Sequence, residues 1–307
     1  MTIDGEKVDF CTTYIFKSAG KHTVIVLLDL SEMLTLNSIF YNSEMTSIIF
    51  SEKFNTKKII YMNNMFKGFS QLTSINLSYF NTKNVENMKY MFLECRSLVS
   101  LDLSNFNTQN VEYMNSMFKN CTSLISIDLS NFDVRKVKNI NSFFYNCSSL
   151  IYANLSSFKI RNAEDISYMF KNCASLTSID LSSFDTENVI NMTQTFYQCP
   201  LIKSINLSNF NTKNLELASS MFEGCKSLTS INLSSWVNTK IDNIWNIFKD
   251  CPSLKHIDIR SFEWNKKIEN LLSSDFLPQS AELILNNDFY LHLSRITNIT
   301  KWNITTI

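Results

Sequence analysis

Seven of the eight cysteines in this chain recur at every twenty-sixth position, without a single slip. Eight phenylalanines keep the same interval. A fixed period of this length is typical of solenoid proteins, in which each unit buries its apolar face against its neighbours. The sequence therefore predicts one elongated domain of copied units. The residues that define the period are Cys95, Cys121, Cys147, Cys173, Cys199, Cys225 and Cys251, together with Phe66, Phe92, Phe118, Phe144, Phe170, Phe196, Phe222 and Phe248.

The first half of each unit has the period of a β-strand. In the copy that begins at Leu98, the pattern LxxLxL places Leu101 and Leu103 on one side of an extended segment. Asp102, between them, points to the other side. This alternation predicts a short half-buried strand in each unit, and stacked copies of the strand would form a parallel sheet.

The second half of each unit has apolar residues at i, i+3, i+6, i+7 and i+10, which lie on one side of a helix. Asn110 precedes this segment at the position of an N-cap, and Asn84 and Asn188 repeat it in other copies. We therefore predict a helix or a helical turn here. In the same copy the apolar residues are Val111, Met114, Met117, Phe118 and Cys121.

A strand followed by a returning helix, repeated without pause, predicts an α/β solenoid. Residues 37–262 would form about nine 26-residue units, with a parallel sheet on one side and short helices on the other. Residues 1–36 are predicted to be a β-hairpin cap, and residues 263–307 a non-repeating C-terminal cap in which Phe289 and Trp302 seal the last unit. The hairpin would pair residues 8–16 with residues 22–28.

At the level of the whole repeat, the copy LDLSNFNTQNVEYMNSMFKNCTSL, residues 101–124, resembles the repeat of BspA-like leucine-rich repeat surface proteins. The resemblance covers about residues 37–262. It implies a leucine-rich-repeat-like stack. It also implies a location on the cell surface, in mucosal bacteria or in protists, and a role in adhesion to host proteins or to other cells.

The charge balance limits the partners of the chain. Twenty-eight basic residues balance 28 acidic ones, so the broad positive field of a nucleic-acid or anionic-membrane binder is absent. The apolar run at residues 24–28 is too short to cross a bilayer, and the first ten residues lack the features of a signal peptide. From the residues alone we expect a cytoplasmic monomer without membrane insertion, whereas the resemblance suggests the cell surface.

The regularly spaced cysteines lie in apolar contexts such as MFKNCTSL, and we predict that they are small, reduced core residues. Some disulfides between neighbouring units are an alternative, because stacked strands lie only ~4.8 Å apart. A metal site is a further alternative, but a straight column of sulfur atoms offers ligands from one direction only. We therefore expect no metal and no cofactor.

The outward side of the strands carries a column of asparagines and aspartates, flanked by a column of serines. The side chains could hydrogen-bond up and down the stack and only stabilise it. Alternatively, they form a polar strip that binds a protein or a glycan. Calcium between Asp102 and Asp128 is a third possibility, although the strip offers few of the six to eight oxygens that calcium prefers. The column consists of Asn76, Asp102, Asp128, Asn154, Asp180, Asn206, Asn232 and Asp258.

Departures from the repeat on the same face point to a contact site. Tyr152 replaces serine in the middle copy, and beside it Val99, Ile125 and Ile151 stand where other copies have threonine or lysine. An exposed apolar patch of this kind can mark a binding site. The alternative is that these residues fill the corner before the strand and are partly buried.

Signatures of catalysis are weak. Ser230, His256 and Asp258 fall on neighbouring units, but His256 and Asp258 lie ~6.6 Å apart along a strand. The four glycines cannot build a phosphate-binding loop. The sequence therefore predicts a non-catalytic recognition or adhesion module that holds a protein or glycan partner on the strand face, with an intracellular scaffolding protein as the alternative.

Overall fold

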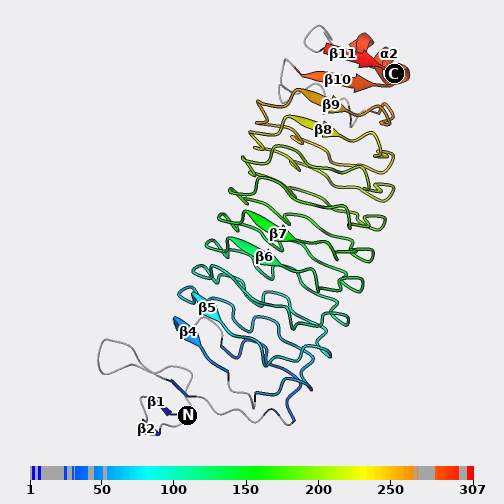
Figure 1. The fold of residues 1–307 in the computed structure, drawn as a ribbon. Coiled ribbons are helices and arrows are strands. Elements are labelled where there is room, and N and C mark those ends of the chain that lie inside the picture. The colour runs from blue at the N-terminus through cyan, green and yellow to red at the C-terminus, as the bar shows by residue number, and fades with distance from the viewer. Residues whose placement is uncertain are drawn as a thin grey trace.

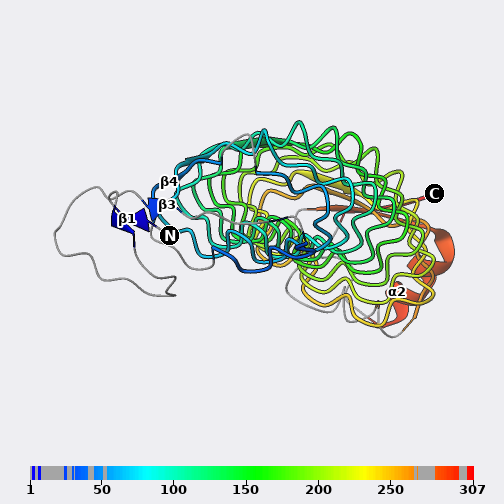
Figure 2. The same cartoon turned by 90° about the horizontal axis from the view of Figure 1, so that it is seen from below.

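The structure is a computed structural model, and the fold is a long stack of similar coils (Figure 1). Seen from below, the coils nearly overlie one another, each slightly displaced from the one before (Figure 2). The structure describes residues 2–3, 6–7, 24–25, 30, 32–40, 45–50, 54–265, 268, 281–296 and 303–307.

Short parallel strands form one side of the stack, as predicted. β6 (Ser126–Asp128) pairs with β7 (Tyr152–Asn154), and Ser126 lies opposite Tyr152, the equivalent position of the next coil. The burial pattern of β6 alternates, with Ile127 buried between two exposed residues. The other strands of the stack are β4 (Ser47–Ile48), β5 (Ser74–Ile75), β8 (Ser230–Asn232), β9 (His256–Asp258), β10 (Glu282–Leu285) and β11 (Asn303–Thr306).

A second line of parallel pairing joins the coils at another corner. Eight isolated bridges, each between equivalent positions of neighbouring coils, run from Thr35 to Asn243. The coils are therefore held together at two places around their circumference. The described residues form a β-solenoid of about eight turns, and the nine predicted units are not confirmed.

The predicted short helices of the repeat are not confirmed. Between Met114 and Cys121, backbone N–H groups do not donate four residues back, as they would in a helix. Those of Ser116, Phe118 and Asn120 donate to the next coil, at 2.8–3.0 Å. The N–H groups between them donate to carbonyls three residues back, at 3.1–3.3 Å. The segment is thus a run of tight turns whose hydrogen bonds alternate between its own coil and the next.

This conformation requires left-handed residues. Ser116 has φ 56° and Asn120 has φ 62°, and the coils from residue 62 to residue 251 repeat such a pair. The same apolar residues still face inward, because Met114, Met117 and Phe118 are fully buried. The predicted core face was therefore right although the backbone conformation was not. The predicted N-cap asparagines have another role. Asn84, Asn110 and Asn188 each donate from Nδ2 to a carbonyl 27 residues earlier, at 2.8–2.9 Å.

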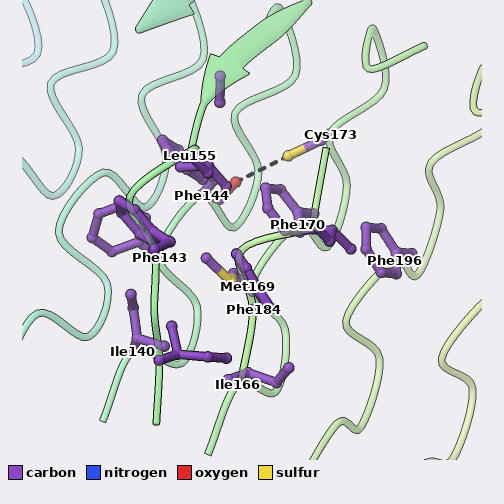
Figure 3. Close-up of a cluster of buried hydrophobic side chains, with 14 of the residues drawn as sticks. Ile140, Phe143, Phe144, Leu155, Ile166, Met169, Phe170, Cys173, Phe184 and Phe196 are labelled. Carbon is purple, nitrogen blue, oxygen red and sulfur yellow. Dashed lines mark hydrogen bonds between the residues drawn. The ribbon is translucent and has the colours of Figure 1, made fainter. Parts of the chain in front are cut away.

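The periodic phenylalanines form a continuous stack in the core. From Phe66 to Phe248, rings of neighbouring coils lie 5.3–5.9 Å apart and within 21° of parallel. Figure 3 shows Phe144, Phe170 and Phe196 in this arrangement. Since each ring contacts the rings before and after it, no coil has a complete core of its own.

The periodic cysteines lie beside this stack and are free and buried, which confirms that they are core residues. Each thiol donates to the carbonyl of the phenylalanine 29 residues earlier, at 3.0–3.2 Å. Figure 3 shows this bond between Cys173 and Phe144. Burial raises the pKa of Cys121 and of Cys251 to about 12, so these thiols stay protonated and unreactive at neutral pH.

The ends of the chain differ from the repeat. β1 (Thr2–Ile3), β2 (Glu6–Lys7) and β3 (Val24–Ile25) form an antiparallel sheet in the order β2-β1-β3. Most of the predicted hairpin lies outside the described residues, as does Trp302. The domain boundaries at residues 1–36, 37–262 and 263–307 stay predictions.

At the C-terminal end, the sheet continues as β8-β9-β10-β11, all parallel. The helix α2 (Asn287–Ile296) lies between β10 and β11 in sequence. Its Phe289 is buried and packs edge-on against Trp264, with ring centroids 5.1 Å apart. Phe289 thus packs against an aromatic residue at this end of the chain, and the sealing of the last unit stays a prediction.

Candidate functional site

The polar column of the strand face caps the turns that follow the strands. In each coil, the side-chain Oδ1 accepts a hydrogen bond from the backbone N–H two residues later, at 2.9–3.2 Å. This local bond replaces the predicted bonding up and down the stack as the main role of the column. The capping bond explains the choice of residue along the column without requiring a binding partner. The residues concerned are Asn76, Asp102, Asp128, Asn154, Asp180, Asn206, Asn232 and Asp258.

The caps hold three carboxyl groups in their charged form. The backbone N–H groups of Ser104, Ser130 and Ser182 lower the pKa of Asp102, Asp128 and Asp180 respectively, and the hydroxyls of the same serines act in the same direction. For Asp128, the side chain of Asn154 in the next coil adds a smaller contribution. A carboxylate accepts these bonds better than a carboxylic acid does, so charge and cap are coupled.

We expect the stability of the protein to fall in acid because of these caps. Since folding lowers their pKa below the ordinary 3.8, the charged carboxylates stabilise the fold above that pH. This contribution is lost as the pH falls through the folded-state pKa. A variant with Asp102, Asp128 and Asp180 all replaced by asparagine, the residue other coils use, keeps its neutral caps. Urea unfolding at pH 7 and pH 2.5 should show a smaller loss of stability in the variant, whereas equal losses would contradict the role of the caps.

Further bonds between coils are made by residues that the sequence analysis did not single out. Nδ2 of Asn105 donates to the carbonyls of Leu77 and Phe80 in the preceding coil, at 3.0 and 2.9 Å. The buried hydroxyl of Thr108 donates to the carbonyl of Asp133 at 3.1 Å and accepts the N–H of the same residue at 2.8 Å. The recurrence of asparagine or serine before the strand-end phenylalanine, and of threonine two residues after it, was the available signal.

The apolar patch predicted on the strand face is exposed. Side chains of Val99, Ile125, Ile151 and Tyr152 are 43%, 45%, 51% and 57% exposed. The N–H of Ile125 donates to the carbonyl of Val99 at 3.1 Å, and that of Ile151 to the carbonyl of Ile125 at 2.9 Å. These three residues therefore stand side by side on successive coils. Tyr152 extends the patch onto β7.

The suspected catalytic trio is not assembled. Asp258 binds Arg260, with Nη2–Oδ2 2.5 Å and Nε–Oδ1 3.0 Å. His256 Nδ1 instead lies 2.8 Å from Oε2 of Glu282, whose Oε1 accepts the hydroxyl of Thr305 at 2.7 Å. These contacts join β9, β10 and β11 across the C-terminal end of the sheet. They explain the charged residues there without a reaction.

A further column, on the turn side, was missed by the sequence analysis. Lys119, Tyr145, Lys171 and Tyr197 follow one another on successive coils. Nζ of Lys119 lies 4.5 Å from the ring centroid of Tyr145, and Nζ of Lys171 lies 5.5 Å from Tyr145 and 4.5 Å from Tyr197. Burial lowers the pKa of Lys171. Cation–π contacts of this kind stabilise the stack and occupy the tyrosine faces.

The described ranges offer no candidate for two other kinds of site. Those ranges contain no cluster of three or more histidine, cysteine, aspartate or glutamate side chains suited to a metal ion. They also contain no helix that is long and apolar enough to span a membrane.

A stack of 26-residue coils with parallel strands on one side and tight turns on the other is a leucine-rich-repeat-like solenoid, a class whose members are generally protein-interaction modules. The chain belongs to the family described as "Mycoplasma protein of unknown function, DUF285", which matches residues 28–153, 80–180 and 165–276. Together these matches cover residues 37–262, where the repeat resembles that of BspA-like leucine-rich repeat proteins.

Three solved structures show what the chain is similar to. A leucine-rich repeat protein from Bacteroides ovatus is 17% identical, over 88% of this chain and 86% of that one, with a TM-score of 0.34. A leucine-rich cell surface protein from Faecalibacterium prausnitzii is 15% identical over 88% and 82%, with a TM-score of 0.39. A leucine-rich repeat protein from T. pallidum is 16% identical over 60% and 85%, with a TM-score of 0.29.

No curated protein has significant sequence similarity to the chain. The comparisons indicate no enzyme family.

Proposed function

We propose that this protein is a non-catalytic recognition or adhesion module that holds a protein or glycan partner along the strand face of the solenoid. The proposal includes a location at the cell surface, which rests on the resemblance of the repeat to BspA-like surface proteins. The observation that carries the binding role is the exposed patch of Val99, Ile125, Ile151 and Tyr152 on successive coils.

The patch favours binding because stacking does not require its residues. Other copies of the repeat have Thr177, Lys203 or Thr229 at the position of Ile125, and Ser126 or Ser178 at the position of Tyr152. Exposed β-branched side chains beside a tyrosine offer apolar contact area together with one hydroxyl for hydrogen bonding. Such a centre, surrounded by the serines and capped carboxylates of the face, has the apolar core and polar rim of a protein-binding surface.

The double variant Ile125→Thr with Tyr152→Ser tests the patch. Immobilised wild-type protein is expected to retain at least one ligand from an array of extracellular-matrix proteins and glycans. Loss of a tyrosine and an aliphatic anchor should weaken that binding at least tenfold. The thermal unfolding of the variant should match that of the wild type, because both new residues occur at these positions in other coils.

Tyr113→Ser is the matched control, because Tyr113 is 40% exposed but lies on the line of isolated bridges, away from β6 and β7. It should leave binding unchanged. Equal binding by the double variant and the wild type would exclude the patch, and absence of any ligand on the array would count against adhesion. If a membrane-impermeant label applied to intact cells does not react with the protein, the result would favour the intracellular scaffolding protein instead.

A further inference from the structure

An open groove runs across several coils beside the line of isolated bridges. It has a volume of 540 Å³ and spans the coils from Lys138 to Lys240. One side carries Lys138, Glu164, Ile190 and Glu216, which occupy the same position in successive coils. The groove thus presents one side chain per coil in a straight line.

The opposite side of the groove consists of the amides of Asn162, Asn188 and Asn214. Nδ2 of each donates to the carbonyl of the residue 27 positions earlier, at 2.8–2.9 Å. These bonds fix the direction of the amides, so that each has its Oδ1 as a hydrogen-bond acceptor. The middle of the groove is therefore rich in acceptors, with amide oxygens on one side and two carboxylates on the other.

The two lysines that line the groove, Lys138 and Lys240, each contact a neighbouring side chain. Nζ of Lys138 lies 2.6 Å from Oε2 of Glu112, and Nζ of Lys240 lies 2.7 Å from Oδ1 of Asn214. These contacts do not involve Glu164 or Glu216, so neither lysine is paired with a carboxylate of the groove through them. Lys138 precedes Glu164 at the same position of the coil before it, whereas a carboxylate, Asp242, follows Glu216 in the coil after it.

The order of side chains in the middle is carboxylate, aliphatic, carboxylate. Glu164, the half-buried Ile190 and Glu216 lie on three successive coils, so the two carboxylates are separated by two coil spacings, or ~10 Å. A chain of methylenes with an ammonium group at each end has the complementary order. Its charged ends match the carboxylates, and its apolar middle matches Ile190.

We propose that this groove binds a short linear α,ω-diamine. One terminal ammonium group binds Glu164 and the amide oxygen of Asn162, the other binds Glu216, and the methylenes lie over Ile190. The groove shares no residue with the apolar patch, so this site does not depend on the proposed function.

A series of α,ω-diamines tests the proposal by ligand-detected NMR at low salt. 1,7-Diaminoheptane, which can span two coil spacings when extended, is expected to bind. 1,3-Diaminopropane and heptylamine should bind at least fivefold more weakly, because each reaches only one carboxylate. Binding should weaken with added salt, since the carboxylates are exposed.

Three variants locate the site. Glu164→Gln and Glu216→Gln should each reduce the affinity for 1,7-diaminoheptane about fivefold. Ile190→Asn should reduce the advantage of the diaminoheptane over the diaminopropane. Glu86→Gln is the control, because Glu86 occupies the same position in a coil outside the groove.

The outcomes distinguish a built site from general attraction of cations. Length-dependent binding that only the groove variants weaken would support it. Binding that falls equally in Glu86→Gln, that shows no dependence on chain length, or that is absent in the wild type would overturn it. Preference for a neutral oligosaccharide such as cellotetraose over the diamines would also overturn it.

Discussion

Replacement of Phe144 by alanine is expected to lower the free energy of unfolding by about 3–5 kcal/mol. The ring is fully buried and stacks on Phe118 and Phe170, with centroids 5.5 and 5.8 Å away. It also meets Phe143 edge-on at 4.7 Å. Because the ring lies between two coils, its removal leaves a cavity that weakens both interfaces. Urea unfolding followed by circular dichroism would measure the loss.

Tyr79→Ala serves as the control for this measurement. Tyr79 is 45% exposed, so its truncation removes a similar number of atoms without opening a cavity. Its effect should stay within ~0.5 kcal/mol. If the Phe144→Ala variant unfolded at the same urea concentration as the control, the stacked phenylalanines would not be what holds the coils together. Loss of cooperativity in the variant would show instead that the stack separates at this interface.

Replacement of Asn172 by isoleucine is expected to cost about 1–3 kcal/mol, although the side chain is only half-buried. Asn172 has φ 61°, in the left-handed region, where a β-branched side chain clashes with the backbone. Its N–H donates to the carbonyl of Tyr197 in the next coil at 2.8 Å. Relief of the strain by a change of φ would break this bond between coils.

Asn172→Gly separates strain from the loss of the side chain. Glycine already occupies this position as Gly68 and Gly224, with φ 80° and 79°. The glycine variant should therefore be about as stable as the wild type, and the isoleucine variant clearly less stable in thermal unfolding. Equal destabilisation by both substitutions would show that the amide, and not the backbone conformation, is what the position needs.

The sequence alone was sufficient to predict the stack, the strands and the inward-facing residues. The constant interval between the cysteines from Cys95 to Cys251 requires contacts between equivalent positions, and the alternation around Ile127 is the pattern of a half-buried strand. Both features depend on the order of apolar and polar residues, which the sequence displays directly.

The turns could not be predicted in the same way. A helix brings apolar residues spaced three or four apart to one side. A run of turns with hydrogen bonds to the third residue back does the same, so the spacing of Met114, Met117 and Phe118 is compatible with both conformations. The usual marker of a left-handed backbone is glycine, but here Ser116 and Tyr168 adopt positive φ. Interactions between coils select the conformation, and a pattern within one copy does not reveal them.

In the candidate site, too, some features could be predicted from the sequence and others could not. The departure of Ile125 and Tyr152 from the repeat could be read directly from the sequence, but it left open whether these residues are exposed or partly buried. The capping role of Asp128 could not be predicted, since alternation gives the side of a strand and not the hydrogen-bond partner. The groove between Glu164 and Asn188 could be recognised only once the coils were in register, because its two sides are formed by several copies together.

The hydrogen bonds of the turn segments run from coil to coil, along the length of the stack. A pulling force applied along that axis would therefore load one interface at a time, because each coil contacts only its neighbours. Every coil that detached would release one repeat unit, or up to roughly 90 Å of extended chain. Under tension the protein would lengthen in equal steps, which is the mechanical behaviour of an extensible tether.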